Sequence, residues 1–64
     1  MIEITYNSDV ADIFEIYLES DTHIYWEDHA RNHLRINKIN NKVSMFLNGK
    51  WESYNSVIKS YRII

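Results

Sequence analysis

Cysteine is absent from this sequence, which excludes disulfide bonds and thiolate metal sites. A chain without cysteine fits a reducing compartment, and we expect a cytoplasmic protein. The sequence shows neither the basic start and apolar run of a secretory signal peptide nor an apolar stretch of the roughly 18 residues that a membrane span requires. Its 64 residues predict one small domain over 1–64. The core should be marginal, because so short a chain buries only about 60% of its unfolded surface.

Basic residues are missing from the first thirty positions. Residues 1–30 hold eight acidic side chains and no Lys or Arg, whereas residues 31–64 hold seven bases and one acid, Glu52. The halves therefore carry −8 and 7 − 1 = +6, which sum to the net charge of −2. Such asymmetry bears on association and steering, not on fold. Two interpretations stay open: separate charged surfaces, or charges that pair across the fold and keep the domain in solution.

The first third of the chain predicts a strand followed by a helix. Ile2, Ile4 and Tyr6 alternate with the polar residues Glu3 and Thr5, which is the period of a half-buried strand. Residues 7–9 (Asn-Ser-Asp) are typical of a helix N-cap. Apolar residues then recur at helical spacing, at Val10, Ile13, Phe14, Tyr17 and Leu18. We therefore expect an amphipathic helix over about 9–20.

The middle of the chain predicts an antiparallel meander. Strands are expected at 22–27, 34–37, 42–47 and 50–54, where β-branched, aromatic and other apolar residues alternate with polar ones. Asn40-Asn41 predicts a tight turn. Asn48-Gly49 uses the only glycine and predicts a hairpin. Ile24 and Trp26 are expected to face the core, and so is Trp51.

The tail fits two structures. Val57, Ile58, Tyr61 and Ile64 have helical spacing, with residues 55–56 (Asn-Ser) as the cap, yet Val, Ile and Tyr also favour strands. We favour a short helix. The expected fold class is α+β, with one helix packed on a mainly antiparallel sheet in the order β-α-β-β-β-β and a short C-terminal helix or strand.

One face of the expected helix is a candidate protein-binding surface. Ile16 would project from the middle of a group of carboxylates, which is the form of a contact anchor with a charged rim. A lone exposed isoleucine is also common on protein surfaces. The candidate site comprises Asp9, Asp12, Glu15, Ile16 and Glu19.

The outer face of the expected sheet is the alternative site. It would mix bases with aromatic rings, as do sheets that bind single-stranded RNA or DNA. No RNA-recognition signature and no glycine-rich phosphate loop accompanies it. The residues of this alternative nucleic-acid site are Arg35, Lys42, Phe46, Lys50 and Tyr54.

Metal binding and catalysis lack supporting motifs. His29 and His33 would share a face if this stretch were helical, and two such imidazoles can ligate zinc. However, Ala30 stands where a metalloprotease helix carries its Glu, and Arg31 repels a cation. There is no nucleophile elbow, and a domain this small struggles to enclose a pocket of about 300 Å³ or more. We expect surface histidines, no metal, no cofactor and no enzymatic activity.

Together these features predict a small non-enzymatic binding protein that acts by stoichiometric protein–protein interaction through the acidic helix face. The richness in Ile, Asn, Lys and Tyr is similar to that of many short phage and mobile-element proteins, which indicates an inhibitor of a host factor. Binding of single-stranded nucleic acid is the alternative. A homodimer formed by opposite charged surfaces is a further expectation, and no membrane partner is expected. The sequence does not identify the partner or the biological process.

Overall fold

The computed structural model describes residues 1–54 and 58–64, which form eight strands and no helix. The predicted α+β class is therefore wrong, and the fold is all-β. The strands are β1 (Ile2–Tyr6), β2 (Ala11–Phe14), β3 (Ile16–Glu19), β4 (His23–Glu27), β5 (His33–Asn37), β6 (Val43–Leu47), β7 (Lys50–Ser53) and β8 (Ile58–Ile63).

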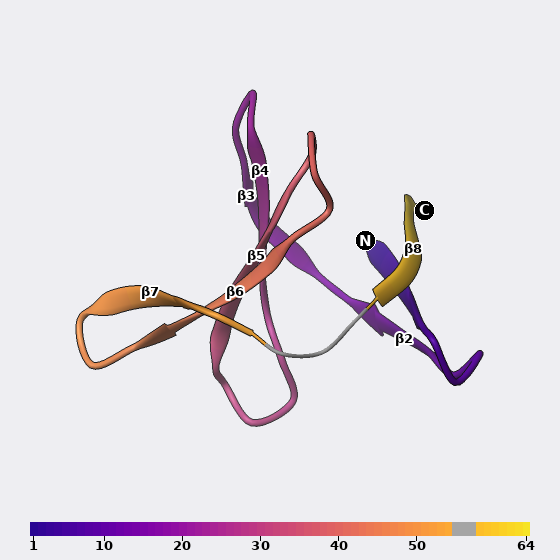
Figure 1. The fold of residues 1–64 in the computed structure, drawn as a ribbon, viewed down its shortest axis with the longest axis horizontal. Coiled ribbons are helices and arrows are strands. Elements are labelled where there is room, and N and C mark those ends of the chain that lie inside the picture. The colour runs from indigo at the N-terminus through magenta and orange to yellow at the C-terminus, as the bar shows by residue number, and fades with distance from the viewer. Residues whose placement is uncertain (55–57) are drawn as a thin grey trace.

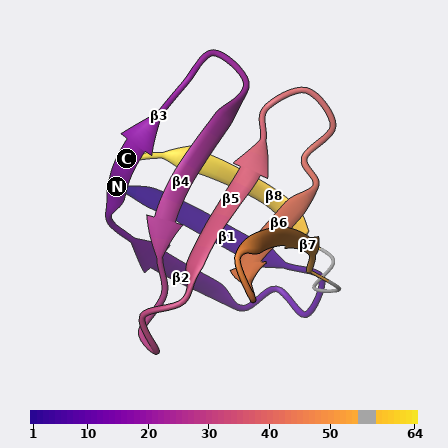
Figure 2. The same ribbon diagram turned by 90° about the vertical axis from the view of Figure 1, so that its left-hand side faces the viewer.

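The strands form two antiparallel sheets. One has three strands in the order β2-β1-β8, and the other has five in the order β3-β4-β5-β6-β7. The two sheets lie face to face, and the strands of one run across those of the other (Figure 2). The β6–β7 hairpin extends away from the three-stranded sheet (Figure 1). The two ends of the chain lie side by side, because the Met1 amino group donates a hydrogen bond to the Ile64 carbonyl at 2.9 Å.

The core lies between the two sheets and comes from alternate positions of five strands. Trp26 is its largest side chain and is 2% exposed. Because every second residue of a strand points to the same face, the alternation in the sequence selects these side chains. The inward positions expected for Ile24 and Trp26 are confirmed. The buried residues are Ile2, Ile4, Phe14, Ile24, Trp26, Leu34, Ile36 and Val43.

The stretch predicted to be a helix over 9–20 forms β2 and β3. The Asn-Ser-Asp segment expected to cap the helix makes a hairpin turn, in which the Tyr6 N–H donates to the Val10 carbonyl at 2.8 Å. Asp9 has a φ of 66°, a left-handed conformation that Asp tolerates better than most residues. Glu15 alone separates β2 from β3, and there the chain passes from one sheet to the other, as strands do at the corners of crossed sheets.

The buried side chains in this stretch have the spacing of a strand and not that of a helix. Of the apolar set at helical spacing only Phe14 is buried, while Val10 and Tyr17 are 56% and 51% exposed. The inward residues are Phe14 and Ile16, two positions apart. Isoleucine, valine and tyrosine lose side-chain freedom in a helix and pack well on a pleated sheet, which favours the extended form.

The four strands predicted in the meander are confirmed within one residue at each end. The predicted Asn48-Gly49 hairpin is also confirmed, with φ angles of 52° and 82° at these two residues. This two-residue turn pairs Leu47 with Lys50 and Phe46 with Trp51. Because directly paired residues point to the same face, Trp51 joins Phe46 on the outer face, and its predicted inward position is wrong.

The tail is a strand, so the short C-terminal helix that we favoured is wrong. Strand β8 pairs with β1, and Ile4 lies opposite Tyr61. Ile58 and Tyr61 pack partly buried against the core. The predicted cap at residues 55–56 and the position of Val57 lie outside the described residues.

Candidate binding surface

The residues of the expected acidic surface do not share one face. Asp9 lies in the β1–β2 turn, Glu15 at the passage between the sheets, and Glu19 at the end of β3. Without a helix, nothing aligns their carboxylates along a common stripe. The acidic helix face is therefore wrong as a structural unit.

The other two residues of that set point toward the interior. Asp12 pairs with the buried Ile4 of β1, so its carboxylate faces the space between the sheets. Ile16 pairs with the buried Trp26 and packs against the core. Ile16 is therefore a supporting core residue and not an exposed contact anchor.

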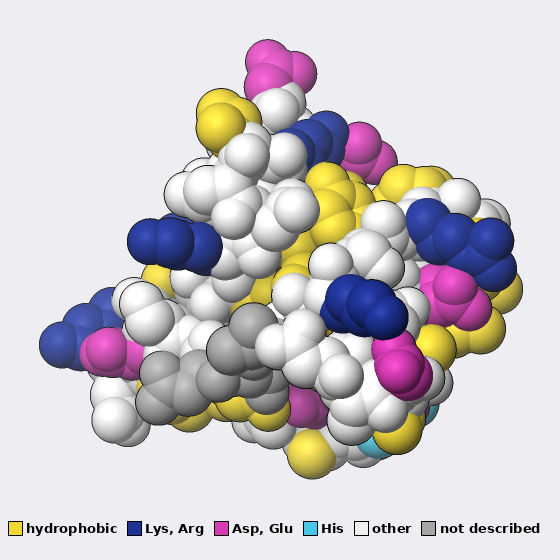
Figure 3. All heavy atoms as spheres, turned by 45° about the vertical axis from the view of Figure 1, so that its right-hand side comes forward, with side chains coloured by type: hydrophobic (Ala, Val, Ile, Leu, Met, Phe, Trp, Pro, Cys, Tyr) yellow, Lys and Arg dark blue, Asp and Glu magenta, His cyan; other side chains and the backbone are white. Residues whose placement is uncertain are grey.

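The charges that are separated along the sequence are mixed in space. Three ion pairs each join an acid of the first thirty residues to a base of the second half. Consistent with this, Figure 3 shows Lys and Arg side chains lying next to Asp and Glu side chains over the face it presents. For these six side chains the pairing interpretation holds. The pairs are Lys59–Asp9 at 2.7 Å, Arg62–Glu3 at 2.6 Å and Lys38–Glu19 at 2.7 Å.

The outer face of the five-stranded sheet, toward which Figure 2 looks, carries a connected group of aromatic rings. Tyr25 of β4 is at its centre. The centroid of its ring lies 5.7 Å from Trp51, 6.3 Å from Tyr17 and 6.0 Å from His23. Trp51 in turn contacts Phe46 at 5.2 Å in an edge-on arrangement. We call this surface, made of Tyr17, His23, Tyr25, His33, Arg35, Phe46 and Trp51, the aromatic face.

Arg35 crosses the middle of the aromatic face. Its guanidinium carbon lies 4.5 Å from the centre of the Trp51 ring, a cation–π contact. Its Nε is enclosed and has no hydrogen-bond partner among the described residues. An enclosed donor without a partner costs about 1–3 kcal/mol. Such local costs are more typical of functional positions than of ordinary packing.

A strand irregularity brings Tyr17 onto the aromatic face. The β3–β4 register shifts between Ile16, which lies opposite Trp26, and Leu18, which lies opposite Tyr25. A bulge of this kind inserts one extra residue and redirects side chains. The Tyr17 hydroxyl consequently lies 3.0 Å from the Nδ1 of His33 on β5.

The aromatic face is close to electrically neutral. Burial first, then the nearby Glu27 and Tyr25, raise the pKa of Tyr17, so its hydroxyl stays protonated at neutral pH. Burial and then Arg35 lower the pKa of His23, which keeps that ring uncharged. Among the outward residues of β4 to β7, the formal charges are Arg35 and Glu27, of opposite sign.

The alternative nucleic-acid site is divided by the structure. Arg35 and Phe46 lie on the aromatic face, as expected. Lys50 lies on the other side of its strand and forms an ion pair with Glu52 at 3.4 Å. Lys42 precedes β6 in an exposed turn, and Tyr54 lines a cavity between the sheets.

Sequence reasoning missed five residues of the aromatic face. The available signal for Trp51 was the two-residue turn, because Asn48-Gly49 fixes the pairing of Phe46 with Trp51. The outward position of Tyr25 followed from the inward Trp26. No local signal placed Tyr17, since its position depends on the bulge. The missed residues are Tyr17, His23, Tyr25, His33 and Trp51.

The two histidines considered for metal binding make different contacts on different surfaces. The His29 ring packs on Phe14 with centroids 5.2 Å apart, whereas His33 bonds to Tyr17 on the aromatic face. Within residues 1–54 and 58–64, no three His, Asp or Glu side chains gather to hold a metal ion. The same residues contain no helix long and apolar enough to cross a membrane.

Comparison with protein-family models, with curated proteins and with solved structures found no match. Neither these comparisons nor the fold supports the expectation of a phage-type inhibitor of a host factor.

Proposed function

We propose that this chain is a small non-enzymatic domain that binds a protein partner on its aromatic face. The observation that carries the proposal is the contact of Arg35, Trp51 and Tyr25 in the middle of an exposed sheet face. Trp, Tyr and Arg are the residue types that most often dominate the free energy of protein association.

The side chains of this surface are held in place before any partner binds. Each ring contacts another ring or Arg35, and the Tyr17 hydroxyl is fixed by His33. Side chains that are already ordered lose less conformational entropy on binding, so more of the contact energy remains as affinity.

The charge of the face favours a protein over a nucleic acid. Aromatic rings alone can stack on bases, but binding to single strands also requires a positively charged groove for the phosphates. Here Glu27 offsets Arg35, while Lys38 and Lys50 are engaged by Glu19 and Glu52. A neutral surface whose rings carry hydroxyl and N–H groups suits a polypeptide better than a nucleic acid.

The test compares variants of the aromatic face with a matched control. The partner is captured with the wild-type chain, purified, and titrated by calorimetry. Tyr17→Ala and Phe46→Ala remove rings that are 51% and 42% exposed, so folding should be retained. If these rings are binding hot spots, each change should cost about 2 kcal/mol, or roughly thirtyfold in affinity.

The control is Ile13→Ala, which truncates a side chain of similar exposure, 47%, on the other sheet. It should leave the affinity unchanged. Wild-type affinity in both aromatic-face variants, with unaltered thermal melts, would show that the partner binds elsewhere.

Single-stranded nucleic acid is tested in parallel. Fluorescence anisotropy with labelled single-stranded RNA and DNA in about 50 mM salt should show no binding up to about 50 μM protein. Binding that weakens in Tyr17→Ala and Phe46→Ala would assign the aromatic face to nucleic acid and overturn the protein partner. A cytoplasmic location is part of the proposal, and fluorescence microscopy of the tagged chain in its native cell tests it.

A further inference from the structure

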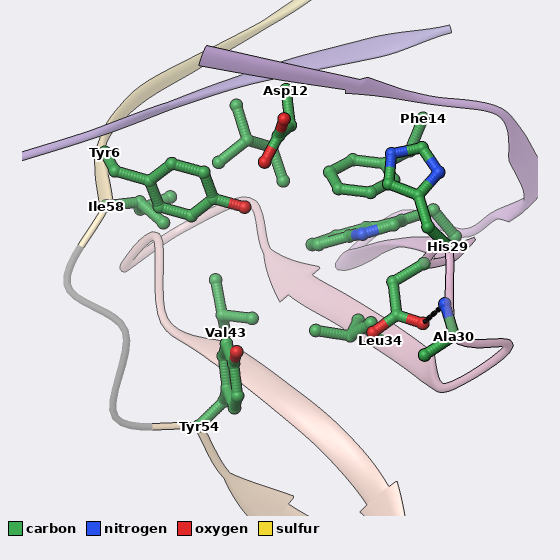
Figure 4. A pocket seen from close by; sticks show the side chains of 12 residues that line it. Tyr6, Asp12, Phe14, His29, Ala30, Leu34, Val43, Tyr54 and Ile58 are labelled. Atoms are coloured by element: carbon green, nitrogen blue, oxygen red, sulfur yellow. Dashed lines mark hydrogen bonds between the residues drawn. The ribbon is translucent and has the colours of Figure 1, made fainter. Parts of the chain in front are cut away.

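A second candidate site lies between the two sheets, apart from the aromatic face. It is a cavity of about 280 Å³ (Figure 4). Its floor consists of core residues, among them Phe14, Trp26 and Val43. Its polar lining residues come from β1, β2, the β4–β5 loop and the residue after β7, and they are Tyr6, Asp12, Asp28, His29 and Tyr54.

Strand β2 turns an acid toward this cavity and an apolar residue toward solvent. Asp12 lies opposite the buried Ile4 and faces inward, whereas Ile13 is 47% exposed. The reverse order would be expected of a strand that only covers a core. Placing a carboxylate beside apolar side chains costs free energy unless a partner compensates it. A local rule broken in this way is expected at functional or strained sites.

The Tyr6 hydroxyl lies on the same side of the cavity as Asp12 (Figure 4). Burial, then the charge of Asp12, raises the pKa of Tyr6. Tyr6 therefore stays protonated, and its hydroxyl is a donor on the same side of the cavity as Asp12. In Figure 4 the hydroxyl of Tyr6 and the carboxylate of Asp12 lie toward the same part of the cavity. An ionised carboxylate has several acceptor positions, so Asp12 can accept hydrogen bonds from a ligand.

Asp28 adds a second negative charge. Its carboxylate is held by hydrogen bonds from the Ala30 N–H at 2.9 Å, the Asn32 N–H at 2.8 Å and the Asn32 side-chain amide at 3.0 Å. Among the described residues that line the cavity, there is no Lys or Arg. The cavity therefore favours a cation and repels an anion.

Aromatic rings supply the second element of recognition. The Phe14 ring lies 6.0 Å from Trp26 and 5.2 Å from His29, measured between centroids. The faces of such rings attract ammonium groups and pack against apolar ones. A cavity with an apolar floor that includes aromatic rings, and with two carboxylates in its lining, is complementary to a molecule that carries a positive charge on a compact apolar body.

We propose that this cavity binds a free small organic ammonium ion, a primary amine that carries one aromatic ring. Its ammonium group is held by Asp12, and its ring packs on Phe14 and Trp26. The cavity is close to the lower end of the usual size of ligand sites, about 300 Å³, which suits a molecule of about ten non-hydrogen atoms. The site is independent of the aromatic face, so either proposal can fail without the other.

Phenethylammonium is the test probe, used with ¹⁵N-labelled wild-type chain in an NMR titration. Two matched probes, 2-phenylethanol and 3-phenylpropionate, replace the positive charge by none or by a negative one. We expect a dissociation constant of about 1 mM or below for the amine, and at least about tenfold weaker binding of the other two. Shifts should centre on His29, Ala30 and the indole N–H of Trp26, and the indole of Trp51 should not move.

A pair of variants completes the experiment. Asp12→Asn keeps the shape and removes the charge, and it should weaken phenethylammonium at least about tenfold. Asp21→Asn removes an exposed charge outside the cavity lining and should bind like wild type. Wild-type affinity in Asp12→Asn, or equal binding of 2-phenylethanol, would overturn the proposal. If Asp12→Asn is unstable, the probe comparison on the unaltered chain decides. Tighter binding of an acetylated, amidated lysine than of phenethylammonium would also overturn it, because the ligand would then be a peptide side chain.

Discussion

Asp28 organises the loop between β4 and β5. Its carboxylate accepts the three hydrogen bonds from Ala30 and Asn32, and Arg31 adopts a φ of 65° within the same loop. Burial acts to raise the pKa of Asp28, but the hydrogen bonds from Asn32 and Ala30, with a smaller effect of His29, outweigh it and lower the pKa. The ionised carboxylate is thus part of the loop structure.

Removing this carboxylate should reduce stability in a pH-dependent way. A carboxyl group with a lowered pKa in the folded state stabilises the fold at pH values above its pKa in the unfolded state, which is about 3.9 for Asp. This stabilisation is lost as the pH falls through the pKa of the folded state. Asp28→Ala should therefore cost about 1 kcal/mol at pH 7, and the difference from wild type should shrink as the pH falls below the unfolded pKa of Asp. Urea unfolding at several pH values measures this. A constant difference at all pH values would show that the charge of Asp28 is not involved.

The burial expected for Ile13 and Ile16 in a helix is the reverse of their burial in the observed strands. In the helix Ile13 would be in the core and Ile16 exposed, whereas in the structure Ile13 is 47% exposed and Ile16 packs against the core. Ile16→Lys should therefore cost about 2 kcal/mol or more, and Ile13→Lys less than about 0.5 kcal/mol. Thermal unfolding separates them, since 1 kcal/mol shifts Tm by about 4–8 °C in a domain of this size. The reverse ranking would contradict the strand assignment.

At the scale of elements, the Asn48-Gly49 turn determines how the aromatic face is assembled. It sets the register of β6 and β7, and hence the pairing of Phe46 with Trp51. Gly49 has a φ of 82°, and a Cβ added there would meet no atom within 4 Å. Any cost of a side chain at this position is therefore conformational and not steric crowding by neighbours.

Gly49→Ala should lower the free energy of unfolding by about 1 kcal/mol, because L-residues are strained at positive φ. Asn48→Gly is the matched control and should be nearly neutral, since Asn48 already has a φ of 52°. Urea midpoints of both variants provide the measurement. A neutral Gly49→Ala would argue against the two-residue turn and against the register that depends on it.

The strands of the meander were predictable because each had a local signal. Alternation selected Ile24, Trp26, Leu34 and Ile36 for the core, and the Asn-Gly pair marked the hairpin. The strands in the segments at 9–20 and 58–64 were not predictable, because the spacing of their apolar residues fits a helix as well as a strand. There the decision is tertiary: β2 and β8 supply the two hydrogen-bonded neighbours of β1, and β3 pairs with β4.

At the scale of the whole molecule, folding brings the two charged halves of the sequence together. Asp9 with Lys59 and Glu3 with Arg62 tie β1 and its turn to β8. Exposed pairs of this kind contribute about 0–1 kcal/mol each, so their main effect is on the charge pattern. They leave fewer charges for contacts between copies. A homo-oligomer remains a proposal, which sedimentation at low and high salt tests.

The candidate surface was predictable only in part. Arg35 and Phe46 were identified as outward residues, because each alternates with apolar neighbours along its own strand. The contact of Trp51 with Tyr25 joins strands that are not adjacent in the sheet, and the position of Tyr17 requires a bulge. These features arise from the assembled sheet and have no signature in any single segment.

The most direct test of the central claim is chemical-shift mapping of the captured protein partner on the ¹⁵N-labelled chain. Binding through the aromatic face predicts the largest changes at Tyr25, Arg35 and the indole N–H of Trp51, with little change at Ile13 on the outer side of the three-stranded sheet. Changes that centre on Ile13 and its neighbours, with the Trp51 indole unmoved, would contradict the account.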